Sequence, residues 1–191
     1  MIIRYIAWIV LSVYCTIPAF WLVIHPFVQR WRQHGRDAYK ILLPVWAIFI
    51  VIAALATFQH LHRTFYHSRV ALIAGAAVIL LGVFIYTLAF PGFGRTKVSG
   101  LAELEPDRHH QFLVTSGIRQ RVRHPIYLGH LLEIIGWSIA TGSVSLFVLA
   151  AFAIVTGALM IRLEDNELES RFGQSYREYR SAVPAIIPRL Y

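Results

Sequence analysis

The chain has 191 residues, of which 57% are hydrophobic, and its mean hydropathy of +0.58 excludes an ordinary soluble domain. The formal net charge of +8 is compatible with nucleic-acid binding. Because the basic residues fall between apolar blocks, membrane topology accounts for them. We therefore expect membrane lipid as a partner and no nucleic acid.

The apolar residues form four blocks: Tyr5–Ile24, Ile41–Phe58, Val70–Phe90 and Ile126–Ile161. A helix that crosses a bilayer needs roughly 17–25 residues, so each of the first three blocks can cross once. The fourth has 36 residues and is interrupted by Thr141-Gly142-Ser143, which indicates a tight hairpin of two spans. The pattern predicts an all-α integral membrane protein of about five transmembrane helices in a single domain over residues 1–191.

The first block differs from a cleaved signal peptide. Its apolar run is longer than an h-region of about 7–15 residues, and no small-x-small cleavage site follows it. Cys15 is the only cysteine of the chain and lies inside this block. A single cysteine excludes an intrachain disulfide and a multi-cysteine metal site, so we expect a buried structural thiol.

The basic residues indicate how the chain is oriented. With five crossings, one face of the membrane carries only Arg4, Arg63 and Arg69. The other face carries Arg30, Arg32, Arg36, Lys40, Arg95, Lys97, Arg108, Arg119, Arg121, Arg123, Arg162, Arg171, Arg177, Arg180 and Arg189. The positive-inside tendency then predicts an outside amino terminus, a cytoplasmic tail and an active site on the cytoplasmic side.

Two polar segments lie on the predicted cytoplasmic side. Pro91–Val122 is a long connection, of the kind that is usually functional, and its apolar island Phe112–Val114 predicts packing onto the membrane domain. From Arg162 onward, apolar residues recur at helical spacing, which predicts an amphipathic helix that leaves the bilayer. Pro184 and Pro188 are expected to end it.

The strongest candidate site is the run Arg123-His124-Pro125-Ile126-Tyr127, which opens the fourth block. Proline is favoured in the first turn of a helix, where its missing N–H costs nothing. Arg123 and His124 would then lie at the helix start, where the free N–H groups favour an anion. The alternative is a helix cap with an interfacial arginine and tyrosine, which membrane proteins commonly have.

Acidic residues provide two further candidates. Glu133 lies inside the fourth span, with His130 one turn earlier on the same face, and an ionisable group there is a functional candidate. Its alternative is a polar pair that joins two helices. Glu164 and Asp165 end the fifth span, and a tight hairpin would bring them opposite the Arg123 run; the alternative is a solvated helix segment.

Other site patterns are missing from the sequence. His60, His62 and His67 have a spacing that fits no firm metal-binding pattern, so we predict no metal site. The chain has no Gly-rich phosphate loop, no G-x-S-x-G and no H-E-x-x-H.

The motifs of the second half resemble those of the isoprenylcysteine carboxyl methyltransferase family, which is related to the phospholipid N-methyltransferases. The matching residues are Leu113-Val114-Thr115-Ser116-Gly117, Arg123-His124-Pro125-Ile126-Tyr127-Leu128-Gly129, Gly136, and Glu164-Asp165-x-x-Leu168-x-x-x-Phe172-Gly173-x-x-Tyr176-x-x-Tyr179. The resemblance covers about Gly94–Tyr191. The three spans within residues 1–90 carry no diagnostic motif.

The resemblance implies S-adenosylmethionine as the cofactor, bound by residues 91–191. The cofactor-binding residues it implies are Gln111, Phe112, Leu113, Val114, Arg119, His124, Pro125, Ile126, Tyr127 and Glu164. It implies catalytic roles for Arg123, Glu164 and Asp165. We further expect Arg162 and Glu133 to contact the substrate, a lipophilic methyl acceptor.

Several positions depart from the family pattern. Gln111 stands where a histidine is usual, Arg119 stands where a tyrosine is usual, and Asp165 replaces a second glutamate. The family also tends to place a substrate arginine four residues before the first acid of the tail. That position is Met160 here, and Arg162 is the nearest arginine.

The expected function is therefore methyl transfer from S-adenosylmethionine to a lipophilic acceptor, such as the carboxylate of an isoprenylcysteine-like substrate. A carboxylate is already ionised at neutral pH, so the reaction needs no strong general base. One alternative is a membrane reductase of the sterol type, which has a similar Arg-His-Pro-x-Tyr run and uses NADPH. Another is a non-catalytic membrane protein for transport or assembly.

Overall fold

A computed structural model describes residues 2–91, 100–105 and 112–188 of the chain. The described part is an all-α bundle, as predicted, and its one β-type contact is an isolated bridge between Thr64 and Ser143. The main helices are α1 (Ile2–Tyr14), α2 (Ile17–Ile24), α3 (Val28–Arg32), α4 (Tyr39–Phe58), α5 (Arg69–Ala89), α7 (Leu101–Leu104), α8 (Pro125–Thr141), α9 (Val144–Phe172) and α10 (Gln174–Ala182). Short 3₁₀ turns cover His25–Phe27, Gly35–Ala38 and Gly117–Gln120.

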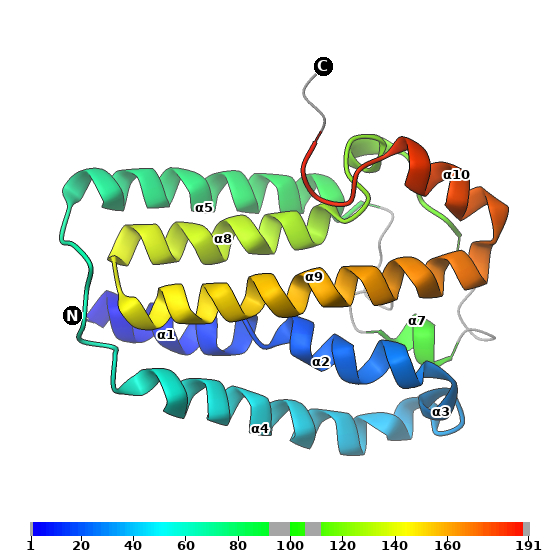
Figure 1. The fold of residues 1–191 in the computed structure, drawn as a ribbon, viewed down its shortest axis with the longest axis horizontal. Coiled ribbons are helices and arrows are strands. Elements are labelled where there is room, and N and C mark those ends of the chain that lie inside the picture. Colours follow the sequence, from blue (N-terminus) through cyan, green and yellow to red (C-terminus); the bar gives the residue numbers. More distant parts are fainter. Residues whose placement is uncertain (1, 92–99, 106–111, 189–191) are drawn as a thin grey trace.

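Within the described residues, four segments are long and apolar enough to cross a membrane: Ile2–Arg32, Gly35–Phe58, Arg69–Ala89 and Val144–Phe172. The predicted number was about five, and the difference lies in α8. This helix has only 17 residues because it starts at Pro125 and stops before Gly142. It lies along both α5 and α9 (Figure 1), and its length is at the lower end of the roughly 17–25 residues of a span.

The first apolar block bends between α1 and α2. Pro18 lies in the first turn of α2, where it cannot donate a helical hydrogen bond. The Thr16 hydroxyl donates instead to the carbonyls of Ser12 and Val13, at 3.1 and 2.8 Å. Cys15 is fully buried at this bend, as predicted for a structural thiol.

The predicted hairpin in the fourth apolar block is confirmed. Gly142 ends α8 with a φ of +63°, a conformation that favours glycine. A Cβ atom on Gly142 would lie 2.6 Å from the backbone oxygen of Tyr66, so the close approach also requires glycine. After Ser143 the chain enters α9 and returns along α8.

The predicted tail helix is divided in two. Helix α9 continues without a break from the apolar segment to Phe172, because residues 162–172 contain no helix breaker. Gly173, with a φ of +58°, then separates α9 from α10. Helix α10 ends at Ala182, shortly before Pro184, in agreement with the predicted end of the tail helix.

Helices α5 and α8 pack through two pairs of glycines. A Cβ atom on Gly75 would lie 2.5 Å from the Gly136 oxygen, and one on Gly82 would lie 2.7 Å from the Gly129 oxygen. Small residues let membrane helices approach closely, so that backbone contacts replace side-chain packing. This contact fixes the position of α8, whose first residues belong to the candidate site.

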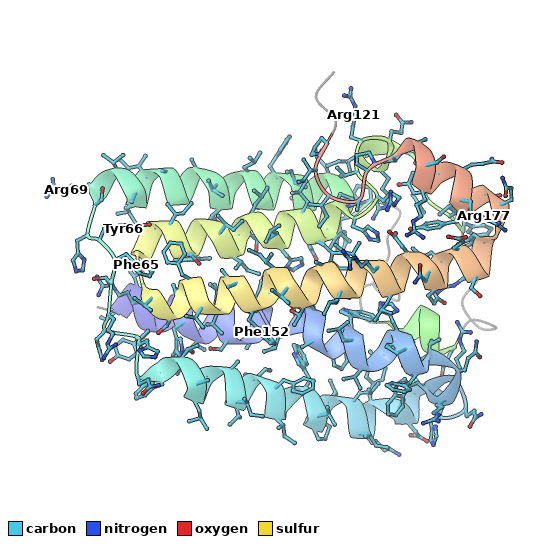
Figure 2. All side chains as sticks on the ribbon, viewed as in Figure 1. Phe65, Tyr66, Arg69, Arg121, Phe152 and Arg177 are labelled. Atoms are coloured by element: carbon cyan, nitrogen blue, oxygen red, sulfur yellow. The ribbon has the colours of Figure 1, made fainter. Side chains whose placement is uncertain are left out.

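Apolar side chains cover much of the outer surface of the bundle. Leu55 on α4, Ile73 on α5 and Val155 on α9 are 71%, 71% and 62% exposed, which suits contact with lipid tails. In Figure 2, Arg121 and Arg177 lie at the end of the bundle that holds α10, and Arg69 lies at the opposite end. We call the end that holds α10 the α10 end.

Candidate functional site

The candidate site lies at the α10 end, where the start of α8 meets the later part of α9 (Figure 1). His124 directly precedes α8, and Pro125 is the first residue of that helix and is buried. The backbone N–H groups of Arg123 and His124 donate to the carbonyls of Pro184 and Ala185, both at 2.9 Å. The segment after α10 is therefore held against the start of α8.

Asp165 on α9 connects these elements. Only 3% of the residue is exposed. Its carboxylate accepts hydrogen bonds from Arg123 Nη2 at 2.7 Å, from His124 Nε2 at 2.9 Å, and from the Tyr176 hydroxyl of α10. Arg180 Nε lies 3.8 Å from the same carboxylate. With three donors on two oxygens, Asp165 is suited to position its neighbours.

Arg123 is only partly satisfied by these contacts. Its Nη1 donates to the carbonyls of Arg180, at 3.1 Å, and Val183, so the guanidinium joins α8 to the segment after α10. Its Nε is buried and has no hydrogen-bond partner in the described part of the chain. A buried N–H without an acceptor is costly, which makes Nε a candidate donor to an anionic ligand group.

Glu164 provides a complementary group. Its side chain is 14% exposed, and Oε2 lies 3.5 Å from His124 Nδ1, an ion-pair distance without a hydrogen bond. Oε2 is buried, and the described residues supply no hydrogen-bond partner for it. A buried carboxylate oxygen in this state is suited to a cationic or N–H-bearing ligand group.

Two tyrosines of the α10 region are held in the neutral form. Burial and the contact with Asp165 raise the pKa of Tyr176 well above its ordinary value, so its phenol remains a hydrogen-bond donor. Burial raises the pKa of Tyr179 to about 12. The Tyr179 hydroxyl donates to the backbone oxygen of Arg119 at 2.7 Å, which joins α10 to the loop before α8.

A cavity of about 590 Å³ extends from this cluster between the helices. Arg162, Glu164 and Asp165 line its polar end, together with Tyr127, whose ring stacks on the His124 imidazole with a centroid separation of 5.5 Å. The remaining lining is mainly apolar and consists of Tyr14, Ile17, Pro18, Trp21, Tyr86, Ile126, His130, Leu131, Ile134, Ala153, Ile154, Gly157, Ala158, Met160, Ile161, Ala185, Ile186 and Ile187. The volume and lining suit a ligand with a polar head and an apolar body.

Comparison with known proteins gives the family. The family model described as phospholipid methyltransferase matches residues 70–175, which is more than half of the chain. The chain belongs to this family. The four apolar segments and the family together make it a multi-pass membrane protein.

Three relatives show the range of this family. The chain is 35% identical to methanethiol S-methyltransferase 2 of Bradyrhizobium diazoefficiens, over 54% of this chain and 35% of that protein. It is 34% identical to protein-S-isoprenylcysteine O-methyltransferase B of Arabidopsis thaliana, over 60% of this chain and 57% of that protein. It is 44% identical to a cobalt-zinc-cadmium resistance protein of Cupriavidus metallidurans, over 44% of this chain and 38% of that protein. The matches therefore span between about one third and about three fifths of each relative.

The second relative bears the name of the family that the sequence motifs resemble, so that resemblance is confirmed. These relatives give no support to the sterol-type reductase alternative. No solved structure matches the chain.

The structure of the chain brings together part of the predicted site. As the hairpin predicted, the two acids meet the Arg123 run: Asp165 contacts Arg123 and His124, and Glu164 lies 3.5 Å from His124. The predicted residues that line the cavity are Ile126, Tyr127, Arg162, Glu164 and Asp165.

Other predicted cofactor-binding residues lie apart from the cavity. Phe112 is 77% exposed, and Leu113 and Val114 are half-buried in the segment before η3 (Gly117–Gln120); none of the three lines the cavity. Arg119 is buried, and its Nη1 donates to the Ala89 carbonyl at the end of α5 at 2.9 Å. Gln111 lies outside the described residues.

Glu133 and His130, one turn apart on α8, have different surroundings. Glu133 is half-buried and lies close to α5: a Cβ atom on Gly82 would be 3.0 Å from its Cγ. Glu133 does not line the cavity, whereas His130 does. The sequence pattern predicted that Glu133 contacts the substrate and indicated no separate role for His130, because spacing alone does not show which side of α8 faces the cavity.

Sequence reasoning also missed residues that complete the site. Tyr176 belonged to the family motif and to the apolar spacing of the tail but was given no role of its own, although its hydroxyl donates to Asp165. Tyr14, Trp21 and Tyr86 line the cavity from the first and third spans. No local motif marks these three residues, because only the packing of α1, α2 and α5 against α8 and α9 brings them to the cavity.

Proposed function

We propose that the protein transfers the methyl group of S-adenosylmethionine to a lipophilic acceptor at the α10 end of the bundle. The observation that carries the proposal is Glu164, which lines a largely apolar cavity and whose buried Oε2 has no hydrogen-bond partner among the described residues. On the segment before α8, the buried Arg123 Nε also has no hydrogen-bond partner among those residues. S-adenosylmethionine has cationic sulfonium and ammonium groups and an anionic carboxylate. A site in which one acidic oxygen and one guanidinium N–H lack hydrogen-bond partners fits a ligand that carries both charges.

The residues that would hold the cofactor follow from this fit. Glu164 faces its cationic part, Arg123 faces its carboxylate, and His124 and Tyr127 provide the stacked rings between them. Arg119 supports the site through Ala89 and Tyr179. Pro125 and Ile126, at the start of α8, belong to the proposed cofactor-binding set within residues 91–191. The segment 111–114 is included on the family resemblance alone, because Phe112, Leu113 and Val114 do not line the cavity.

The bound cofactor supplies an electrophilic methyl group, which leaves sulfur as the acceptor atom forms its new bond to carbon, so that a neutral thioether remains. The protein's residues orient the reactants and exclude water. Asp165 holds Arg123 and His124 in place, and the protonated Tyr176 phenol keeps Asp165 oriented. A carboxylate acceptor is ionised at neutral pH, so alignment in a dry cavity can supply most of the rate.

We propose an acceptor with an anionic head beside Arg162 and an apolar tail in the cavity, as in the carboxylate of an isoprenylcysteine-like molecule. Two relatives are named as methyltransferases of methanethiol and of isoprenylcysteine. The cavity of about 590 Å³ would also hold part of the cofactor, but its mainly apolar lining extends beyond Glu164 and Tyr127 and favours an acceptor with an apolar tail over methanethiol. We also propose that this site lies on the cytoplasmic side, which the distribution of basic residues and the positive-inside tendency support.

The test is a transfer assay with purified protein in lipid nanodiscs. S-adenosylmethionine with a labelled methyl group is mixed with a total lipid and protein extract, and the label is followed into the extract. Glu164→Gln should lower both cofactor affinity and transfer at least about tenfold, equivalent to roughly 1.4 kcal/mol. Glu178→Gln, an exposed change on α10, is the matched control and should leave both unchanged. Absence of cofactor binding by the wild-type protein, or equal binding by Glu164→Gln, would refute the proposal.

A further inference from the structure

The cavity contains one imidazole that the proposed chemistry does not use. His130 lines the cavity from α8, six residues beyond His124, which places it ~9 Å further along the helix axis. Its Nδ1 is buried and has no hydrogen-bond partner in the part of the chain that the structure describes. This nitrogen is thus a buried polar atom for which the described residues provide no hydrogen bond.

Two aromatic rings hold the His130 imidazole in the bundle. The Tyr14 ring of α1 lies 5.1 Å from it, centroid to centroid, at an interplanar angle of 50°. The Tyr86 ring of α5 lies 5.3 Å away in an edge-to-face arrangement, at 89°. Because neighbours from two other helices pack on it, the imidazole is fixed at the cavity wall.

The cavity wall that follows His130 on α8 is apolar. The next cavity-lining residues of α8 are Leu131 and Ile134, and α9 adds Ala153 and Ile154 to the lining of the same cavity. A hydrocarbon tail in this part of the cavity would leave the imidazole unsatisfied, which is costlier than a paired buried group. A neutral imidazole offers one donor and one acceptor, so a hydroxyl can satisfy it in either tautomer.

We infer that His130 is a specificity-determining residue that binds a hydroxyl group within the tail of the acceptor. The ligand class is an amphiphile with an anionic head at Arg162 and a hydroxyl on its apolar body, at the depth of His130. That this ligand is the methyl acceptor rests on the proposed function. The binding preference itself requires only the cavity.

The test compares hexadecanoic acid with a series of its monohydroxylated isomers, in which the hydroxyl is moved along the chain. Binding to the protein in nanodiscs is measured by competition in native mass spectrometry, without cofactor. The wild-type protein should bind one mid-chain isomer at least about tenfold more tightly than the parent acid. His130→Leu, which is similar in size and apolar, should reduce this preference to less than about twofold and keep the affinity for the parent acid.

Two further variants serve as controls. Leu131→Val changes the neighbouring cavity wall without removing a polar group and should retain the preference. His130→Asn keeps a donor and an acceptor and should restore part of it, which also covers the case in which His130→Leu fails to fold.

The outcomes separate this inference from the proposed function. Equal binding of all isomers by the wild-type protein overturns the role of His130, and so does an undiminished preference in folded His130→Leu. If His130→Leu does not fold, absence of the preference from His130→Asn overturns it. The same lipids are then offered with labelled S-adenosylmethionine. If the preference is present but no lipid or extract component is methylated, the proposed function fails and the binding role of His130 stands. Methylation without the preference supports the proposed function and refutes the role of His130.

Discussion

Replacement of Asp165 by asparagine should loosen the α10 end of the bundle. The side chain of Asp165 is 5% exposed and that of its partner Arg123 is 8% exposed, so water cannot take over their ion pair. Removal of one partner from a buried pair costs about 3–5 kcal/mol. Arg123 keeps its bonds to the carbonyls of Arg180 and Val183, so we expect the lower end, about 3 kcal/mol.

Hydrogen exchange measures this loss where it should occur. The backbone N–H groups of Arg123 and His124 donate to Pro184 and Ala185, and these bonds open when the segment after α10 detaches. A loss of about 3 kcal/mol corresponds to exchange roughly two orders of magnitude faster at both amides. Amides near the middle of α5, which is remote from Asp165, should be unaffected.

Glu169→Gln is the matched control for Asp165→Asn. Glu169 also pairs with Arg180, at 3.1 Å, but both side chains are more than a third exposed. Exposed pairs contribute at most about 1 kcal/mol, so exchange at Arg123 and His124 should change little. Equal acceleration by Glu169→Gln, or none by Asp165→Asn, would refute the view that Asp165 holds the site together.

Three other predictions concern packing, topology and the acceptor. Gly82→Leu should sharply lower the folded yield measured by size exclusion, because even a Cβ atom there would lie 2.7 Å from the facing α8 backbone. Gly157→Ala should be tolerated in the same assay, because its Cβ would lie 3.9 Å from the nearest neighbouring atom. In intact cells, and in a cysteine-free background, an impermeant thiol reagent should label a cysteine at Ser68 but not one at Ser181; labelling of the latter would contradict the proposed topology. Arg162→Glu should raise the acceptor KM at least about fivefold and leave cofactor affinity nearly unchanged, whereas loss of cofactor binding at constant KM would show that Arg162 serves the cofactor.

Local pattern was sufficient for the helices and for the core of the candidate site. Residues such as Leu55 and Ile73 must face an apolar environment, so their runs predicted α4 and α5 to within two residues at each end. The helix breaker Gly142 marked the hairpin, and the hairpin in turn predicted that Glu164 and Asp165 would meet Arg123 and His124. These features depend on chain-local chemistry and on the geometry of one tight turn.

Pattern was less informative where a residue's role depends on the side of a helix that it occupies. Glu133 and His130 are one turn apart and both lie near α5, yet only His130 lines the cavity. Arg119 was expected at the cofactor, but its guanidinium bonds to the end of α5. In each case the deciding contact comes from a helix distant in sequence, whose position the local motif does not encode.

The amino-acid sequence by itself determined the membrane class, the helical elements and the family motifs at the start of α8 and the end of α9. Only the tertiary structure decided that Tyr14, Trp21 and Tyr86 enclose a cavity with those motifs at its mouth. Hydrophobic length and helix breakers act within one segment, so the sequence shows them directly. The cavity is lined by residues of α1, α2, α5, α8 and α9, so it exists only when these helices are packed together.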